Sequence, residues 1–215
     1  MSTSRAARKA ETRERILAAA LTLLTSGRSL DSLGLREVSR EAGLAATSLY
    51  NHFPDMEALG LALIDLACYR LRSTMRLGRG ELVMREPVEG LREVVVRFLQ
   101  YLDGFEGEFR LLVQQRLGNS SAFRRRVHRE LQTLVEELAE DVRAVSEHLG
   151  LPPMDYLDAS EAAVAVMFGF GILALDLPSG RRHRRVDDLV TQLTMVFLGG
   201  RALAAGVALG QPISQ

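Results

Sequence analysis

The sequence is poor in the residues from which disulfides and metal sites are built. Cys68 is its only cysteine, so an intramolecular disulfide is excluded, and a single thiol fits a reducing cytoplasm. The histidines are scattered without the spacing of a metal-ligand set, at His52, His128, His148 and His183. No nucleophile is paired with a base in a recognisable catalytic pattern. We therefore expect no metal or other cofactor, and no enzyme.

Long hydrophobic runs and strand patterns are also missing. The longest uncharged apolar run in the C-terminal half is 162–175, which falls short of the roughly 20 residues that a membrane span needs. The N-terminus is charged and lacks the apolar core of a signal peptide. We therefore expect a cytoplasmic protein with no membrane span. No strand-like alternation and no solenoid repeat stands out.

Neither sign of charge is in excess, because 27 basic residues balance 27 acidic ones. The net charge therefore predicts no partner, but the distribution is informative. Residues 1–15 carry five basic side chains against two acidic ones. A basic arm of this kind can bind nucleic acid, although a solvated tail explains it equally well. Lys9 is the only lysine, so nearly all basic charge is arginine.

Apolar residues recur at steps of three and four along the whole chain, which predicts an all-α protein of about nine helices. Asp55 fits an N-cap and Pro87 a first helical position. The segment "PSGRRHRR", 178–185, is interpreted as a loop. A division near residue 54 gives a three-helix helix-turn-helix domain, 1–54, and a larger ligand-binding and dimerisation bundle, 55–215.

The stretch "LREVSREAGLAATSLYNHF", 35–53, fits two short helices joined by a tight turn at Gly43. Leu49 and Phe53 form the inner face of the second helix. Its outer face has small and hydroxyl side chains that allow close approach to a DNA major groove. The candidate contacts on and beside it are Ala46, Thr47, Ser48, Tyr50, Asn51 and His52. An ordinary helical corner with a polar face is the alternative, and spacing alone does not decide.

The segment "TRERILAAALTLL…LREVSREAGLAATSLYNHFPDMEALG" resembles the DNA-binding segment of the TetR family of bacterial transcriptional regulators. The match includes Thr12, Arg13, Ile16, Ala20, Val38, Ala42, Gly43, Leu44, Leu49, Tyr50, His52, Phe53 and Leu59. The chain departs from the family at Ala45, where a capping hydroxyl is usual, and at Met56, where a phosphate-binding lysine is common. The resemblance then implies that Tyr50, His52, Arg36 and the arm hold the DNA backbone.

A closer resemblance adds "FRLLVQQRLGNSSAFRRRVHRELQ", 109–132, and points to the fatty-acid-responsive branch of the family. In that branch an alanine at position 45 and the lack of a lysine at position 56 are usual. It implies a repressor of fatty acid desaturation and unsaturated fatty acid genes. Long-chain acyl-CoA would regulate it, with saturated and unsaturated chains having opposite effects on operator binding. The alternative is a TetR-type repressor of an efflux or metabolic gene that responds to another hydrophobic ligand.

An acyl-CoA sensor needs an apolar tunnel with a polar, basic mouth. The candidate tunnel residues are Phe98, Leu102, Phe105, Phe109, Leu112, Val113, Met167, Phe168 and Phe170. Arg116 is a candidate at the mouth, since a guanidinium suits phosphate. Alternatives for the mouth are Arg124, Arg125, Arg126, Arg129 and the segment "RRHRR", 181–185. Plain core packing for the apolar residues, and a solvated face for the arginine, remain the alternatives.

The last two long helices carry several glycines and alanines, which let helices approach closely. Paired with the same helices of a second copy they would form a four-helix interface. The resemblance implies a homodimer of this kind, with two recognition helices on a near-palindromic operator of double-stranded DNA. Two internal helices of a monomer are the alternative.

Overall fold

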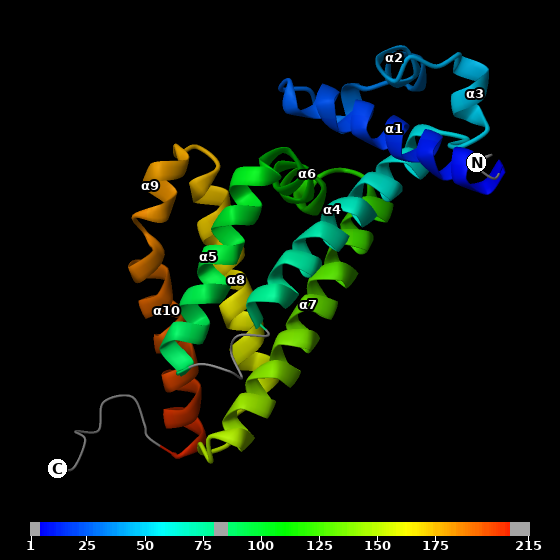
Figure 1. Ribbon diagram of the computed structural model, residues 1–215. Coiled ribbons are helices and arrows are strands. Elements are labelled where there is room, and N and C mark those ends of the chain that lie inside the picture. The colour runs from blue at the N-terminus through cyan, green and yellow to red at the C-terminus, as the bar shows by residue number, and fades with distance from the viewer. Residues whose placement is uncertain (1–4, 80–85, 207–215) are drawn as a thin grey trace. The chain divides into compact units, whose positions relative to one another are not determined.

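The structure is a computed structural model that describes residues 5–79 and 86–206 (Figure 1). Over these residues the chain is all-α, with ten α-helices, one short 3₁₀ helix (η1) and no strand, so the predicted fold class is confirmed. The elements are α1 (Arg5–Thr25), η1 (Leu30–Ser32), α2 (Leu35–Glu41), α3 (Ala46–Tyr50), α4 (Met56–Arg79), α5 (Pro87–Gly104), α6 (Glu106–Leu117), α7 (Ser121–His148), α8 (Tyr156–Ala174), α9 (Ser179–His183) and α10 (Val186–Ala204).

Short-range signals in the sequence explain where several helices begin. The Ala58 N–H donates to Asp55 Oδ1 at 2.7 Å, so Asp55 caps α4 as expected. Pro87 is the first residue of α5, where its missing N–H costs no helical hydrogen bond. Asp155 caps α8 in the same way as Asp55, accepting from the Asp158 N–H at 3.0 Å.

The segment 178–185 is not the loop that its composition suggested, because residues 179–183 form α9. The reason is Arg182, which is only 4% exposed despite its charge. Its Nε donates to the carbonyls of Ala174 and Leu177, both at 2.8 Å, and Nη1 lies 3.3 Å from Asp103 Oδ1. A buried guanidinium with this many acceptors fixes the short helix against α5, which local propensity could not reveal.

The first compact unit contains Met1–Tyr69 and Gly107–His128. In it α1 packs on α2 and α2 packs on α3. The core of this unit is built from fully buried side chains of α1, α2, α3 and α6, including Ile16, Ala20, Val38, Leu49, Phe109 and Leu112. Gly60 of α4 lies so close to Phe123 that an added Cβ would come within 2.5 Å of its ring. This close approach explains why a glycine is placed inside α4.

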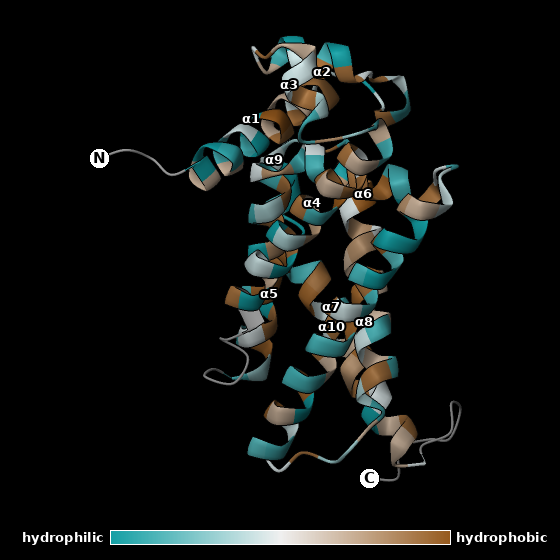
Figure 2. Cartoon of the chain, turned by 90° about the vertical axis from the view of Figure 1, so that its right-hand side faces the viewer, coloured by the Kyte–Doolittle hydropathy of each residue, from teal (hydrophilic) through white to brown (hydrophobic). Residues whose placement is uncertain are grey.

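The second compact unit contains Arg70–Glu106 and Arg129–Gln215. In it α10 packs against α5 and α8, and α9 packs against α5 (Figure 1). Polar and apolar residues alternate along the helices of both units (Figure 2), as expected for helices that each bury one face. Val95, Leu99, Leu102 and Leu193 are at most 1% exposed and form the core of the second unit.

Helix α8 is the one described helix that is long and apolar enough to cross a membrane by length and composition. Such a helix is weak evidence of a span, because the core helices of soluble proteins pass the same test. Ala163, Met167, Phe170 and Ala174 of α8 are buried within the second unit. Part of the apolar surface of α8 is thus buried in the core of the second unit.

Candidate nucleic-acid interface and ligand pocket

The turn between α2 and α3 has the hydrogen bonds of a Schellman motif. Gly43 has φ +62°, the left-handed conformation that glycine adopts without steric cost. The Leu44 N–H donates to the Ser39 carbonyl at 2.8 Å, and the Gly43 N–H donates to the Arg40 carbonyl at 3.0 Å. These bonds satisfy the last carbonyls of α2 and fix the direction in which α3 leaves the turn.

Helix α3 presents the outer face that the sequence predicted, although it is shorter than expected. Thr47, Tyr50 and Asn51 are exposed, with Tyr50 at 49%. Ala46, Ser48 and His52 are half-buried, and Arg36 is exposed on α2. Leu49 and Phe53 are buried, which anchors this face to the first unit. Because α3 ends at Tyr50, Asn51 and His52 lie in the turn before α4.

Arg13 of α1 holds the turn after α3. Its guanidinium lies over the Phe53 ring, 4.3 Å from the ring centre, and its Nη1 donates to the His52 carbonyl at 3.5 Å. Arg13 therefore packs within the unit, a role that neither its place in the basic arm nor the family resemblance had predicted. Arg5, Lys9 and Arg15 of the arm are exposed along α1.

The surroundings of His52, a candidate DNA contact, perturb its ionisation. Burial lowers its pKa below 6.5, and the positive charges of Lys9 and Arg13 lower it further. Nδ1 of the ring is shielded from solvent and has no hydrogen-bond partner among the described residues. His52 is therefore mainly neutral at pH 7, within a cationic surrounding that favours an anion such as a phosphate.

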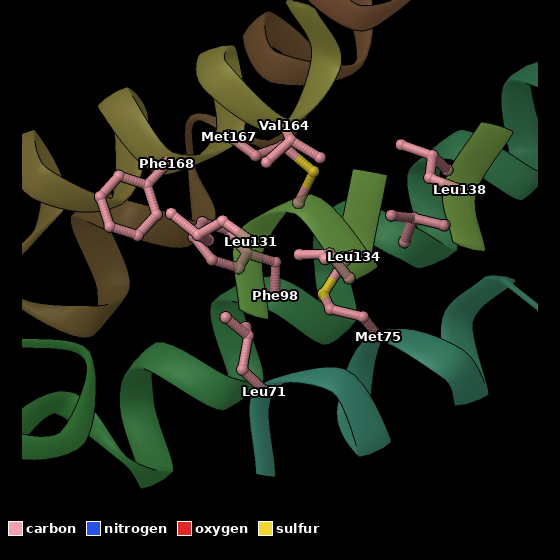
Figure 3. Close-up of a pocket in the computed structure, with 10 residues that line it drawn as sticks. Leu71, Met75, Phe98, Leu131, Leu134, Leu138, Val164, Met167 and Phe168 are labelled. Carbon is pink, nitrogen blue, oxygen red and sulfur yellow. The ribbon is translucent and has the colours of Figure 1, made fainter. Parts of the chain in front are cut away.

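A cavity of about 40 Å³ lies within the second unit (Figure 3). Side chains from four helices, α4, α5, α7 and α8, converge on it, and all of them are apolar. The lining consists of Leu71, Met75, Val94, Phe98, Leu131, Leu134, Leu138, Val164, Met167 and Phe168. A cavity with this lining offers dispersion contacts and no hydrogen bond, so it suits a hydrocarbon group.

Of the ten candidate ligand residues, three line this cavity: Phe98, Met167 and Phe168. The others are placed elsewhere. Leu102 and Phe170 are buried in the second unit, and Phe105 lies under the guanidinium of Arg70, 5.0 Å from the ring centre. The remaining four belong to α6 in the first unit, where Phe109 and Leu112 are buried, Val113 is half-buried and Arg116 is exposed.

Seven lining residues were not among the candidates, for example Leu131, Leu134 and Leu138 of α7. Their steps of three and four identify the buried face of a long helix. That signal does not distinguish a side chain beside a cavity from one in close-packed core, because the difference depends on the facing helices.

Helices α8 and α10 leave apolar side chains exposed. Leu173 is 74% exposed on α8, and Met195 and Leu203 are each 64% exposed on α10. Met195 and Leu203 line an open groove of about 500 Å³, together with Ala159, Ala162, Gly199, Gly200 and other residues of these helices. Large exposed apolar patches are typical of interaction sites.

Known proteins agree with this architecture. Residues 16–63 match the bacterial regulatory proteins of the tetR family. A tetR-family transcriptional regulator from Streptomyces coelicolor is 20% identical, with a TM-score of 0.66 over 96% of this chain and 86% of that one. The SmeT–triclosan complex is 19% identical, with a TM-score of 0.69 over 95% and 100%.

FadR of Thermus thermophilus, a TetR-family repressor in complex with lauroyl-CoA, is 20% identical, with a TM-score of 0.61 over 94% of this chain and 98% of that one. At these identities the structures support the fold, while the match of residues 16–63 identifies the DNA-binding segment. The described chain therefore has the fold of solved TetR-family regulators, and its residues 16–63 match the bacterial regulatory proteins of the tetR family.

Proposed function

We propose that the protein is a dimeric repressor of fatty acid desaturation and unsaturated fatty acid genes, located in the cytoplasm and regulated by long-chain acyl-CoA. It binds a near-palindromic operator through α3. The observation that carries the ligand assignment is the wholly apolar cavity between α4, α5, α7 and α8. The assignment of a regulatory role is supported by residues 16–63, which match the bacterial regulatory proteins of the tetR family.

The chemistry of the cavity suits the tail of such a ligand. None of its ten lining side chains carries a charge or a hydrogen-bonding group, so the CoA moiety must lie outside it. At about 40 Å³ the cavity has room for about three water molecules, so a long acyl chain must displace side chains to enter. Met75 and Met167 are suited to such movement, because methionine is unbranched and adapts its shape.

Two similar solved structures contain hydrophobic ligands, and they support different candidate functions. The structure of Thermus thermophilus FadR contains lauroyl-CoA, which supports an acyl-CoA ligand here. The SmeT complex contains triclosan, a ligand without CoA, and it supports a second candidate function. In that candidate the protein represses an efflux or metabolic gene and responds to another hydrophobic ligand. The absence of any basic residue from the described cavity lining favours this second candidate.

The dimer is supported by the exposed apolar side chains of α8 and α10. Packing against the same surface of a second copy would remove Leu173, Met195 and Leu203 from water. A two-fold axis would then relate two α3 helices, which matches the symmetry of a palindromic DNA site. The dimer would have two arrangements that differ in the separation of its two α3 helices. A ligand changes operator affinity only if it binds one of these arrangements more tightly than the other.

The ligand is tested by titrating a complex of the protein and its operator with palmitoyl-CoA, oleoyl-CoA and triclosan. We expect the two acyl-CoA species to change operator affinity and triclosan to leave it unchanged. The reverse result would replace the acyl-CoA assignment with the second candidate.

Leu131→Trp should fill the cavity and weaken the acyl-CoA response about tenfold. Gln132→Trp, on the same helix but outside the lining, should leave the response unchanged.

The DNA contact is tested at Tyr50. We expect Tyr50→Ala to weaken operator binding by roughly 1–3 kcal/mol, about tenfold or more, as the loss of one DNA contact does. Tyr50 is half exposed, so its removal should leave the folded state intact. Tyr69→Ala removes another exposed tyrosine, on α4, and serves as the matched control. Equal operator affinity of both variants would contradict the assignment of α3.

A further inference from the structure

The bundle-facing side of α10 ends in a charged residue. Leu189, Leu193 and Phe197 follow one another at steps of four and are each at most 7% exposed. The next step brings Arg201, which is half-buried. A helix that continued this pattern would carry an apolar residue there. The arginine therefore lies at a position where the packing of the helix calls for a hydrocarbon side chain.

Arg201 lines a cavity of about 70 Å³ within the second unit. The walls are apolar side chains of α5, α7, α10 and the segment after α7, among them Leu91, Val142, Val145, Leu151 and Phe197. This cavity shares no lining residue with the one in Figure 3. It has room for about five water molecules, or for a short apolar chain.

The guanidinium of Arg201 has no anionic partner among residues 5–79 and 86–206. Its Nη2 donates to Ser146 Oγ at 2.7 Å, and that hydroxyl donates to the Val142 carbonyl at 2.8 Å. Its Nε is shielded from solvent and has no acceptor in the part of the chain that the structure describes. Arg182 shows the contrast, since it is paired with Asp103 and Glu106. A partly buried cation without a counter-ion is costly, unless a ligand supplies the negative charge.

We infer that the Arg201 cavity binds a carboxylate that bears a short apolar chain, such as a medium-chain fatty acid. Nε–H and one Nη2–H lie along the same edge of a guanidinium, and a carboxylate accepts from both donors at once. The second hydrogen of Nη2 remains for Ser146. One cation matches one carboxylate, whereas a phosphate would bring up to two negative charges. The site lies outside the proposed acyl-CoA cavity, so its ligand is additional to the proposed function.

The inference is tested by calorimetric titration of the full chain, without DNA, with hexanoate and with 1-hexanol. Both compounds fill the apolar walls, but only hexanoate pairs with the guanidinium. We expect hexanoate to bind at least tenfold more tightly than 1-hexanol. Arg201→Met should weaken hexanoate at least tenfold and leave 1-hexanol within twofold, while Arg201→Lys should retain part of the hexanoate affinity.

Two further variants serve as a control and as a second test of the cavity. Arg143→Gln removes an exposed arginine of α7 that lines a different cavity, and it should bind hexanoate as the unaltered protein does. Leu91→Trp should fill the Arg201 cavity and abolish binding of both compounds, which tests the site even if Arg201→Met fails to fold. Equal affinity for hexanoate and 1-hexanol, no hexanoate binding, or undiminished hexanoate binding by Arg201→Met or Leu91→Trp would overturn the inference. None of these outcomes depends on operator or acyl-CoA.

Discussion

At the scale of single residues, His52 connects protonation with the proposed DNA contact. Burial and the charges of Lys9 and Arg13 keep its pKa below 6.5 in the free protein. A phosphate beside the ring would favour the protonated form and raise that pKa. Binding of the operator would then be coupled to uptake of a proton, so operator affinity should increase as the pH falls.

We expect operator affinity to rise between pH 7.5 and pH 6, by at most about tenfold for each unit by which DNA raises the pKa of His52. His52→Gln should flatten this dependence, whereas His128→Gln, which alters an exposed histidine of α7, should not. The free protein has the opposite linkage. A histidine with a lowered folded pKa loses stability as the pH falls below 6.5, so circular dichroism must confirm folding at each pH. A pH dependence that persists in His52→Gln would contradict the phosphate contact.

At the scale of elements, the sequence predicted what local chemistry determines. Gly43, Asp55 and Pro87 were placed correctly, because a left-handed residue, a side-chain cap and a missing N–H each act within one turn. Helix α9 was not predicted, since Arg182 is stabilised by groups outside α9, the Ala174 carbonyl at the end of α8 and Asp103 of α5. The cavity is formed where four helices meet, so its lining cannot be derived from the periodicity of any one helix. Periodicity therefore identified core residues, but only Phe98, Met167 and Phe168 of the ten lining residues were among the predicted ligand contacts.

The attachment of α9 to α5 should depend on pH through Asp103. Desolvation raises the pKa of this carboxyl, but the hydrogen bonds from His183 and Ser179 and the charges of His183 and Arg182 outweigh it and lower the pKa below 3.8. A carboxyl with a lowered folded pKa contributes stability above its unfolded pKa. That contribution is lost as the pH falls below about 4 and through the folded value.

We therefore expect Asp103→Asn to lower the free energy of unfolding at pH 7 by about 1–3 kcal/mol, as the loss of hydrogen bonds to a charged group does. The variant should also lose less stability than the unaltered protein when the pH falls from 5 to 3. Urea unfolding at each pH measures both effects. Asp176→Asn, beyond the end of α8, serves as the control and should follow the unaltered protein. Parallel pH curves for Asp103→Asn and the unaltered protein would exclude the linkage.

At the scale of the whole molecule, the proposed dimer explains the apolar surface of α8 and α10. The two glycines in α10 have different surroundings. A Cβ added at Gly200 would lie 3.3 Å from the sulfur of Met154, within the same chain. A Cβ added at Gly199 would meet no atom of the described residues within 4 Å, although Gly199 lines the groove. Gly199 therefore probes the space outside the chain, where the second copy would lie.

We expect Gly199→Arg to shift the protein from dimer to monomer by at least tenfold in dissociation constant, because the new side chain would occupy the interface without a clash inside its own chain. Analytical ultracentrifugation measures this shift. Gly180→Arg places the same side chain in open space on α9 and should leave the dimer intact. An unchanged dimer in Gly199→Arg would mean that this surface has another partner.

The dependence of His52 on Lys9 has a consequence for chemical modification. Lys9 is the only lysine of the chain and is exposed on α1, so acetylation could reach this one side-chain amine and no other. Acetylation would remove a positive charge from the proposed DNA interface. The same loss would raise the pKa of His52, since the charge of Lys9 helps to lower it. Part of the missing charge would then return on the imidazole in mild acid, so the modified protein should lose less operator affinity at pH 6 than at pH 7.5.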